Sequence, residues 1–381
     1  MANGKDTYKV GITGSYGGLN LGDEAILQSI VTQLRRDLPV EITVFSRDAE
    51  DTKARHGVER AVPVRKLSRA EVAPEVERLD LLILGGGGIL YDADARTYLR
   101  EVSIAREKGV PVMVYAIGAG PLSHAAATAA VREELEHVEV ITVRERAAQR
   151  VLEEAGVHRE ITVTADPALL LKPEALPRGL LKREGLQGRR HLIGMSVREP
   201  GVAAPDLDQN VYHALLANAA DFMVDRYDAD VMFVPMERLD TPHSHAVIAK
   251  MLRAQRATVL KGEFTSGQVL SLMARFDFAV GMRLHFLVFA ALAGTPFVAL
   301  PYAGKVGGFL EDLGLPSPPL NLVNEGRLMA HIDESWDRRR STRAKLEKAV
   351  PPLQERSQQT HRILVELLKK GKLHLASPKA A

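Results

Sequence analysis

The chain of 381 residues has no cysteine, so it forms no disulfide and offers no thiol as a nucleophile or metal ligand. It also lacks a strong excess of charge of one sign. Fifty Lys and Arg residues stand against 48 Asp and Glu residues, for a net charge of +2. Proteins that bind nucleic acid usually present a basic surface. The balance of charge therefore argues against a nucleic-acid partner.

Long hydrophobic runs are also missing. No apolar stretch approaches the ~20 residues that a membrane-spanning helix needs, and the opening residues, MANGKDTYKVGIT, lack the apolar segment of a secretory signal. We therefore expect a cytoplasmic protein. A hydrophobic share of 46% with 26% charged residues is typical of a globular protein. Because 381 residues exceed the usual size of one hydrophobic core, we expect two domains.

Short apolar runs rich in β-branched residues alternate with amphipathic helical segments along most of the chain. Near-continuous apolar runs are typical of parallel strands that are buried on both faces, and their alternation with helices predicts a doubly wound α/β fold. The strands are expected at residues 9–13, 42–45, 79–84, 110–118, 138–144 and 160–166, and again at 191–197, 230–236, 257–263, 276–280 and 297–300.

A stretch rich in Pro, Gly and charge separates these two sets of strands and reads as a linker. The sequence thus predicts two Rossmann-like domains that face each other across a cleft, followed by a charged helical tail interrupted by Pro351 and Pro352. The expected division is an N-terminal domain at 1–172, a linker at 173–190, a C-terminal domain at 191–336 and the tail at 337–381.

Cationic side chains follow two neighbouring strands of the second domain. Arg283 and His285 come directly after the strand at 276–280, and Tyr302 and Lys305 follow the strand at 297–300. In open α/β sheets, ligands bind at the carboxyl ends of the strands. These residues therefore predict a site for an anionic ligand.

The strand ends of the first domain are rich in glycine instead. Gly14 to Gly18 follow the first strand, and four glycines, Gly85 to Gly88, follow the run LDLLIL. Exposed backbone amides in such a segment can bind an anion or a sugar, although the glycines could equally let a helix pack closely on the sheet. Asp23 begins the first helix, where it either complements the helix dipole or faces the cleft to accept a proton from a hydroxylated substrate.

Four basic side chains at strand ends, Arg144, Arg198, His285 and Lys305, are expected to line one cleft. Arginine binds carboxylate or phosphate in a planar, bidentate way, and lysine supplies a compact charge. Histidine exchanges protons near neutral pH. The set fits a small ligand carrying both carboxylate and phosphate. His243 and His245 could be read as metal ligands, but no Cys or carboxylate set completes such a site, so an exposed helix start is preferred.

Seven motifs in order, GSYGGLNLGDEAIL, LILGGGGIL, YAIGAGPL, TVRERAA, TADPALLL, GMRLH and AALAGTPFVALPY, resemble the polysaccharide pyruvyltransferase family over roughly residues 8–312. The similarity is greatest to bacterial enzymes that modify secondary cell-wall polymers to which S-layer proteins attach. The resemblance implies a GT-B-like fold and phosphoenolpyruvate as the donor. It also implies a product in which a pyruvyl ketal bridges two hydroxyls of a sugar, commonly β-ManNAc in a lipid-linked precursor.

The resemblance carries the family's donor-binding Arg, His and Lys onto Arg144, His285 and Lys305, to which we add Arg198 and Arg283 from their positions. His285 would protonate the donor methylene carbon, and Asp23 would assist the attacking hydroxyl. We place the donor in the C-terminal domain. The acceptor is assigned to the N-terminal domain, and its expected ligands are Gly17, Asn20, Asp23, Gly86, Gly87 and Gly88. We expect no metal and no cofactor, and a contact with the inner membrane face through the lipid carrier of the acceptor.

Three alternatives remain open. A nucleotide-sugar glycosyltransferase of the GT-B fold would carry an acidic residue seven positions before the Pro of a G-x-P turn, but counting back from Pro296 gives Phe289, which cannot accept hydrogen bonds from a ribose. A sugar-nucleotide epimerase of similar fold is the second alternative. A non-catalytic glycan-binding protein is the third, and it would not need Arg, His and Lys at the strand ends.

Overall fold

A computed structural model of the chain describes residues 7–184, 191–199, 208–300, 304–316 and 324–369. The chain divides into two compact units. The first contains Met1–Gly18, Ile26–Leu170 and Glu355–Ala381, and the second contains Leu19–Ala25 and Leu171–Gln354. The break in the middle of the chain thus falls after Leu170, against 172 in the sequence-based division, and two short segments belong to a unit that is remote in sequence.

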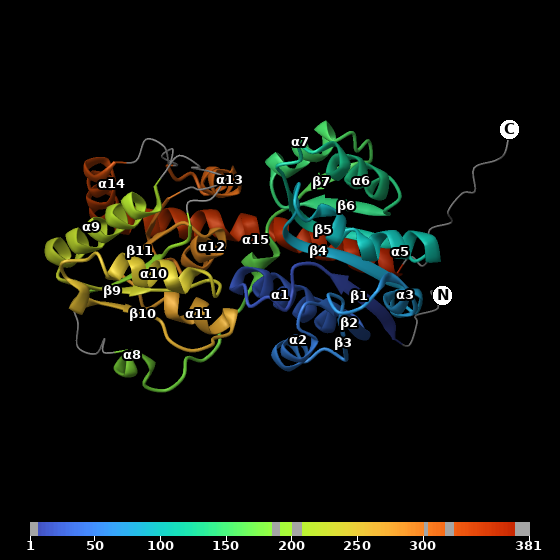
Figure 1. Cartoon of the computed structure of the whole chain (residues 1–381), viewed down its shortest axis with the longest axis horizontal. Coiled ribbons are helices and arrows are strands. Elements are labelled where there is room, and N and C mark those ends of the chain that lie inside the picture. Colours follow the sequence, from blue (N-terminus) through green and yellow to red (C-terminus); the bar gives the residue numbers. More distant parts are fainter. Residues whose placement is uncertain (1–6, 185–190, 200–207, 301–303, 317–323, 370–381) are drawn as a thin grey trace. The chain divides into compact units, whose positions relative to one another are not determined.

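The first unit is built on a seven-stranded parallel sheet in the order β3-β2-β1-β4-β5-β6-β7 (Figure 1). Its strands are β1 (Tyr8–Thr13), β2 (Val40–Ser46), β3 (Arg60–Pro63), β4 (Leu81–Leu90), β5 (Val112–Ala119), β6 (Val140–Val143) and β7 (Ile161–Val163). Its helices are α1 (Leu21–Asp37), α2 (Ala49–His56), α3 (Arg69–Glu77), α4 (Ala95–Tyr98), α5 (Arg100–Lys108), α6 (Ala125–Leu135) and α7 (Arg146–Glu154).

The second unit is built on a five-stranded parallel sheet in the order β10-β9-β8-β11-β12. Its strands are β8 (His191–Ser196), β9 (Ala229–Phe233), β10 (Ala257–Val259), β11 (Phe278–Gly281) and β12 (Phe297–Ala299). Its helices are α8 (Leu180–Arg183), α9 (Gln209–Tyr227), α10 (Asp240–Ile248), α11 (Ser266–Met273), α12 (Leu284–Leu292), α13 (Gly304–Asp312) and α14 (Glu325–Asp337). A capping box opens α11, where the Thr265 side chain accepts from the Gln268 amide and the Gln268 side chain accepts from the Thr265 amide.

In both sheets the first strand in the sequence lies inside the sheet. The next two strands are added on one side of it and the later strands on the other side, as in doubly wound nucleotide-binding folds. Strands at the centre of each sheet are buried on both faces, which is why their sequences read as continuous apolar runs. Ile12, Ile83 and Val231 are fully buried examples. The predicted fold class, two Rossmann-like α/β units with a helical C-terminal segment, is therefore confirmed.

The glycine run of β4 was predicted as a loop beyond the strand, and this prediction is wrong. β4 continues through all four glycines to Leu90, and Gly85, Gly87 and Gly88 pair in register with Tyr115, Ile117 and Gly118 of β5. The parallel ladder takes up the backbone groups of this run, so they do not form a separate anion-binding loop. Strand pairing with β5 outweighs the low strand propensity of glycine.

The C-terminal segment forms one helix, α15 (Arg339–Lys369). The sequence predicted an interruption at the two prolines, and this prediction is wrong, because the helix continues through both of them. Pro351 and Pro352 are exposed, while Val350 and Leu353 on either side of them are buried in the second unit. Packing of these two apolar side chains stabilises the helical conformation on both sides of the prolines. Further along, Thr360 bonds Thr164 at 2.7 Å and His361 bonds Asp37 at 2.8 Å within the first unit. The segment is therefore part of both cores and is not a free tail.

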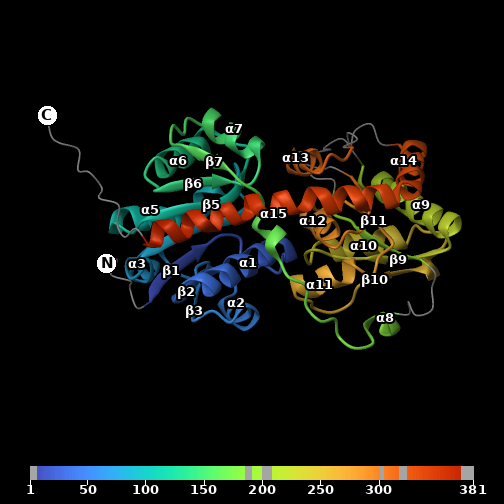
Figure 2. The same ribbon diagram turned by 180° about the vertical axis from the view of Figure 1, so that it is seen from behind.

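Helix α14 belongs to the second unit through an aromatic and polar contact with α9 (Figure 2). Trp336 stacks on Tyr227 with 4.2 Å between ring centroids, and the Tyr227 hydroxyl donates to Asp333 at 3.0 Å.

In the ranges that the structure covers, no helix combines the length and the apolar character needed to cross a lipid bilayer.

Candidate active site

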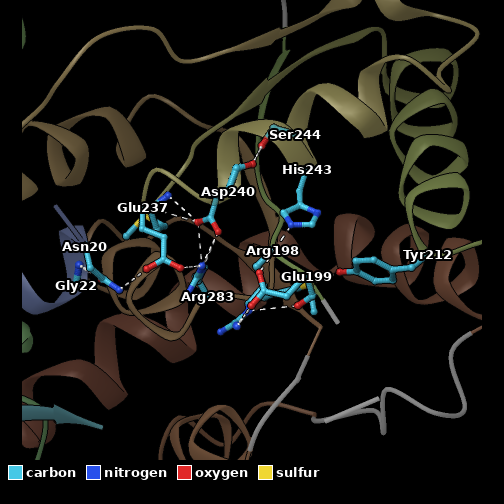
Figure 3. Close-up of polar contacts among 12 residues, drawn as sticks. Asn20, Gly22, Arg198, Glu199, Tyr212, Glu237, Asp240, His243, Ser244 and Arg283 are labelled. Atoms are coloured by element: carbon cyan, nitrogen blue, oxygen red, sulfur yellow. Dashed lines mark hydrogen bonds and ion pairs between the residues drawn. The ribbon is translucent and has the colours of Figure 1, made fainter. Parts of the chain in front are cut away.

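Polar side chains gather at the carboxyl edge of the second sheet. Arg198 follows β8, Glu237 follows β9, and Arg283 follows β11 and caps α12 by position. Because the three strands are parallel and adjacent, their ends bring these side chains to one edge. Figure 3 shows Arg283 and Glu237 facing each other, and Arg198 beside Glu199.

Arg283 is held between two carboxylates. Its Nε lies 3.2 and 3.1 Å from the two carboxylate oxygens of Asp240, its Nη2 donates to the same group at 2.5 Å, and Nη2 also bonds Glu237. Asp240 is fully buried. Burial raises the pKa of Asp240, and the Arg283 guanidinium opposes that rise. Arg283 was predicted to bind the donor, but these contacts give it a different task, which is to fix Glu237 and Asp240.

The same network holds the start of α1. The Asn20 side chain donates to Glu237 at 3.0 Å, and its oxygen accepts from the amides of Gly22 at 3.0 Å and Asp23 at 3.4 Å (Figure 3). The amide of Leu21 donates to the carbonyl of Met236 at 2.8 Å. Asn20 was predicted as an acceptor ligand. Its amide is engaged as a helix N-cap and in a bond to Glu237, which explains why residues 19–25 belong to the second unit.

Gly22 makes the closest of these contacts. A Cβ atom at this position would lie 1.9 Å from Nδ1 of His285, a distance that only a shift of the ring or of the helix could relieve. The backbone of α1 therefore rests directly on the imidazole of His285, the second residue of α12. This contact fixes the ring against the first turn of α1, the turn that also contains Asp23.

Arg198 lies in a second polar group of the same unit. Its guanidinium bonds Glu199, and the other carboxylate oxygen of Glu199 is 3.8 Å from His243 Nε2. His243 Nδ1 lies 3.1 Å from His213 Nε2. Burial, and then the neighbouring His243, lower the pKa of His213, so it stays neutral at physiological pH. A row of three side chains, Glu199, His243 and His213, therefore orients Arg198 at the edge of the sheet.

Lys305, the last predicted donor ligand of this unit, is the second residue of α13 and is half-buried. Tyr302, named with it in the sequence, lies outside the described residues. Asp240, Glu199 and Gly22 were not selected from the sequence. Glu237 follows the strand predicted at 230–236 but was given no role, and neither its pairing with Arg283 nor the closeness of Gly22 to His285 leaves a signal in the sequence.

In the first unit, Arg144 follows β6 and is 4% exposed. Its Nε donates to Glu145 and its Nη1 to Asp166, both at 2.8 Å. Burial opposes the charge on the guanidinium, but the two carboxylates outweigh it and raise the pKa of Arg144. Gly118 of β5 leaves room for this group, because a Cβ atom there would lie 2.8 Å from Arg144 Nη2.

The glycines predicted to bind the acceptor have packing roles. A Cβ atom at Gly86 would meet the Ile26 side chain at 2.5 Å, so Gly86 lets α1 pack on the sheet. Gly17 and Gly87 have positive φ angles of 73° and 95°, and a Cβ at Gly17 would also meet Ser46 at 2.2 Å. Gly88 differs from them in being exposed, although it still pairs with β5.

The described ranges contain no group of three His, Asp or Glu side chains that could hold a metal ion. His243, one of the two histidines weighed as metal ligands, is occupied by His213 and Glu199. The expectation that the reaction needs no metal stays a prediction.

A family model described as polysaccharide pyruvyl transferase matches residues 20–304. The chain belongs to this family. The amylovoran biosynthesis protein AmsJ of Erwinia amylovora is 22% identical over 290 residues, which cover 72% of this chain and 70% of AmsJ. The family predicted from the seven motifs is confirmed, and the protein is a polysaccharide pyruvyltransferase, an enzyme that transfers a pyruvyl group to a polysaccharide.

Solved structures similar to this pyruvyltransferase share its fold at low sequence identity. Staphylococcus aureus MnaA, solved with UDP, has a TM-score of 0.65 and 11% identity over 94% of this chain and 95% of its own. The UDP-GlcNAc 2-epimerase of Neisseria meningitidis gives 0.63 and 10% over 94% and 99%. A glycosyltransferase of Rickettsia africae gives 0.64 and 12% over 96% and 100%. At these identities the likeness supports the GT-B-like fold and carries no information on substrates.

Proposed function

We propose that the enzyme uses phosphoenolpyruvate as the donor and forms a pyruvyl ketal across two hydroxyls of one sugar. The acceptor would be the β-ManNAc unit of a lipid-linked cell-wall polymer precursor. The observation that carries the proposal is the contact of Gly22 with His285, because a ring held against a helix start is oriented for proton transfer.

In this mechanism, Arg198 and Lys305 bind the phosphate and carboxylate of the donor. The protonated His285 gives a proton to the methylene carbon, which becomes the methyl group, and C2 becomes electrophilic. The first sugar hydroxyl attacks C2 as Asp23 takes its proton. The bond between C2 and the phosphate oxygen then breaks, and the second hydroxyl closes the ketal as it returns a proton to His285. The proton on Asp23 leaves with the phosphate, so the enzyme is restored.

Arg144 belongs to the other unit and has a separate place in the proposal. The Nε and Nη1 of its guanidinium already donate to Glu145 and Asp166, so a carboxylate or phosphate of the donor would be bound by the remaining N–H groups of this five-donor side chain. Its part in donor binding is a hypothesis taken from the sequence. Arg283 is removed from the donor ligands and becomes a positioning residue, because its bonds to Asp240 and Glu237 fix the residue that holds Asn20.

The proposed reaction needs no metal or cofactor, since cationic side chains can neutralise the donor. We also propose that the enzyme works at the cytoplasmic face of the membrane, where a lipid-linked precursor would be met. A chelator should leave turnover unchanged, and a metal requirement would overturn the first of these statements.

The rival glycosyltransferase activity would need a ribose ligand near the end of α12. Phe289, which occupies the position of the acidic residue of those enzymes, is fully buried in the apolar core. It can accept no hydrogen bond there. A non-catalytic glycan-binding protein would have no use for a histidine so tightly fitted against a helix start.

Titration calorimetry with phosphoenolpyruvate, UDP-, GDP- and CMP-sugars tests the proposal. Heat on addition of phosphoenolpyruvate alone, lost in Lys305→Ala and Arg198→Ala, is the expected result. Arg150→Gln, a change at an exposed arginine on α7, is the control and should bind the donor normally. Binding of a nucleotide sugar instead of phosphoenolpyruvate would overturn the donor assignment.

A further inference from the structure

The carboxyl edge of the first sheet carries a polar cluster that the mechanism does not use. Ser15 follows β1, Arg47 follows β2 and Arg65 follows β3 by two residues, while Tyr98 ends the short helix α4 after β4. All four residues lie in the first unit. We call them the Arg47 cluster.

Tyr98 is the centre of this cluster. It is 4% exposed, and its hydroxyl accepts from Arg47 Nη2 at 2.5 Å. The same Nη2 lies 3.1 Å from Ser15 Oγ, and the guanidinium carbon of Arg65 lies 5.4 Å from the Tyr98 ring centroid. Arg47 and Arg65 are themselves exposed. A buried tyrosine thus holds two exposed arginines at the edge of the sheet, so less entropy is lost when they bind a ligand.

Two nearby carboxylates accept hydrogen bonds from other groups. Asp48 caps α2 by accepting from the Asp51 amide at 3.1 Å, and Asp94 accepts from the Tyr91 hydroxyl at 2.5 Å. Among the residues that the structure describes, none makes a hydrogen bond or ion pair with the guanidinium of Arg65, which lies over the Tyr98 ring. Gly18, which is exposed, lies next to Arg47, because a Cβ atom at this glycine would be only 3.2 Å from Arg47 Nη1. A ligand can therefore approach Arg47 past a residue without a side chain.

We propose that the Arg47 cluster binds an anionic group, a phosphate or a carboxylate, on the acceptor at a distance from the sugar that receives the pyruvyl group. This assignment rests on the proposed function. Arginine forks suit both anions because they bind two oxygens at once.

The spacing along the sheet sets the size of this acceptor. β2, which ends at the cluster, and β6, which ends at Arg144, are four strand intervals apart. At about 4.8 Å per interval this is roughly 19 Å, longer than one monosaccharide. With Arg144 as a donor ligand, as the proposed function has it, the acceptor would be an oligosaccharide whose anionic group lies some sugar units away from the reacting residue, or a short glycan ending in a diphosphate.

The test measures binding of two probes by calorimetry, with phosphoenolpyruvate at saturation so that the donor site is filled. Inorganic pyrophosphate stands for a diphosphate, and methyl glucuronide stands for an acidic sugar. Arg47→Gln and Arg65→Gln should each weaken binding of the probe that fits by about tenfold, because each removes a charge-assisted hydrogen bond to the anion. Tyr98→Phe, which keeps the ring, should weaken it about threefold by freeing Arg47.

Lys66→Gln is the matched control, because Lys66 is exposed and adjacent to Arg65 but has no contact with Tyr98. If the arginine substitutions weaken binding of pyrophosphate alone, the anionic group on the acceptor is a phosphate. If they weaken binding of the glucuronide alone, it is the carboxylate of an acidic sugar. If the arginine variants bound both probes as the wild type does, or if Lys66→Gln weakened them equally, the site would be wrong. Failure of phosphoenolpyruvate to bind would instead contradict the proposed donor. It would leave the test of the Arg47 cluster intact, because that test compares binding of the probes to the variants and to the wild type.

Discussion

The two sheets share one strand order but use their carboxyl edges differently. In the second, Arg283 is neutralised by Asp240 and Glu237, and a glycine of α1 presses on His285. In the first, Arg144 is held by Glu145 and Asp166, and a glycine of β5 makes room for it. Each edge thus pairs one functional side chain with one glycine that fits it closely. The side chain supplies the chemistry, and the glycine decides where it can lie.

The largest effect is expected from His285→Ala. Loss of the proton donor should lower kcat by about 10²–10⁴, with little change in the thermal unfolding temperature, since the ring is half-buried at the end of a helix. Phosphate release from phosphoenolpyruvate in the presence of acceptor measures this. Turnover near that of the wild type would remove His285 from catalysis.

Gly22→Ala should come next. The new methyl group would displace the imidazole of His285, and we expect kcat to fall about a hundredfold, because a small misplacement of a reacting group has this cost. Alanine favours the helix more than glycine does, so a loss of helix stability is not the reason. Gly308→Ala on α13, where a Cβ has no neighbour within 4 Å, is the control.

Gly118→Ala makes the same change at the first sheet. A Cβ atom there would push on Arg144 Nη2 and on Glu145. If Arg144 binds the donor, KM for phosphoenolpyruvate should rise about tenfold, with kcat less affected than in Gly22→Ala. A fall in kcat with unchanged KM would indicate that the two glycines do not divide binding and proton transfer in this way.

Asn20→Ala removes the cap of α1 and the bond to Glu237. Loss of an N-cap side chain should lower the free energy of unfolding by about 1 kcal/mol, measured by urea denaturation. Asn20→Asp would keep the cap but place a carboxylate against Glu237. Relative to Asn20→Ala, it should therefore restore less of the free energy of unfolding than the charge-neutral Asn20→Ser does.

The smallest effect concerns pH. Burial lowers the pKa of His213 below its value in the unfolded chain, so the unfolded state binds more protons as pH falls below about 6.5. The stability that His213 contributes is present above that pH and is lost as pH decreases toward its folded pKa. His213→Gln should therefore flatten the decrease in unfolding temperature between about pH 7 and 5. An unchanged slope would show that other groups cause it.

Much of this could be predicted from the sequence, for particular reasons. The runs at 79–84 and 230–236 are continuously apolar because parallel strands are buried on both faces, so the two sheets could be read in advance. Arg144, Arg198, Arg283 and His285 could be placed at strand ends because those ends share one edge of a sheet. The four glycines at 85–88 were misread, because strand pairing overrode a composition that favours a loop.

The sequence by itself determined the fold class, the family and the side chains that face the carboxyl edges, because apolar periodicity and local motifs are encoded over short stretches. Only the tertiary structure decided which cations are already paired, that α1 begins in the second unit, and that Gly22 lies against His285. The last two of these facts depend on contacts between residues more than two hundred positions apart, such as Asn20 with Glu237, and the pairing of Arg283 with Glu237 joins residues 46 positions apart. Such contacts follow from packing of the whole core and leave no pattern in the local sequence.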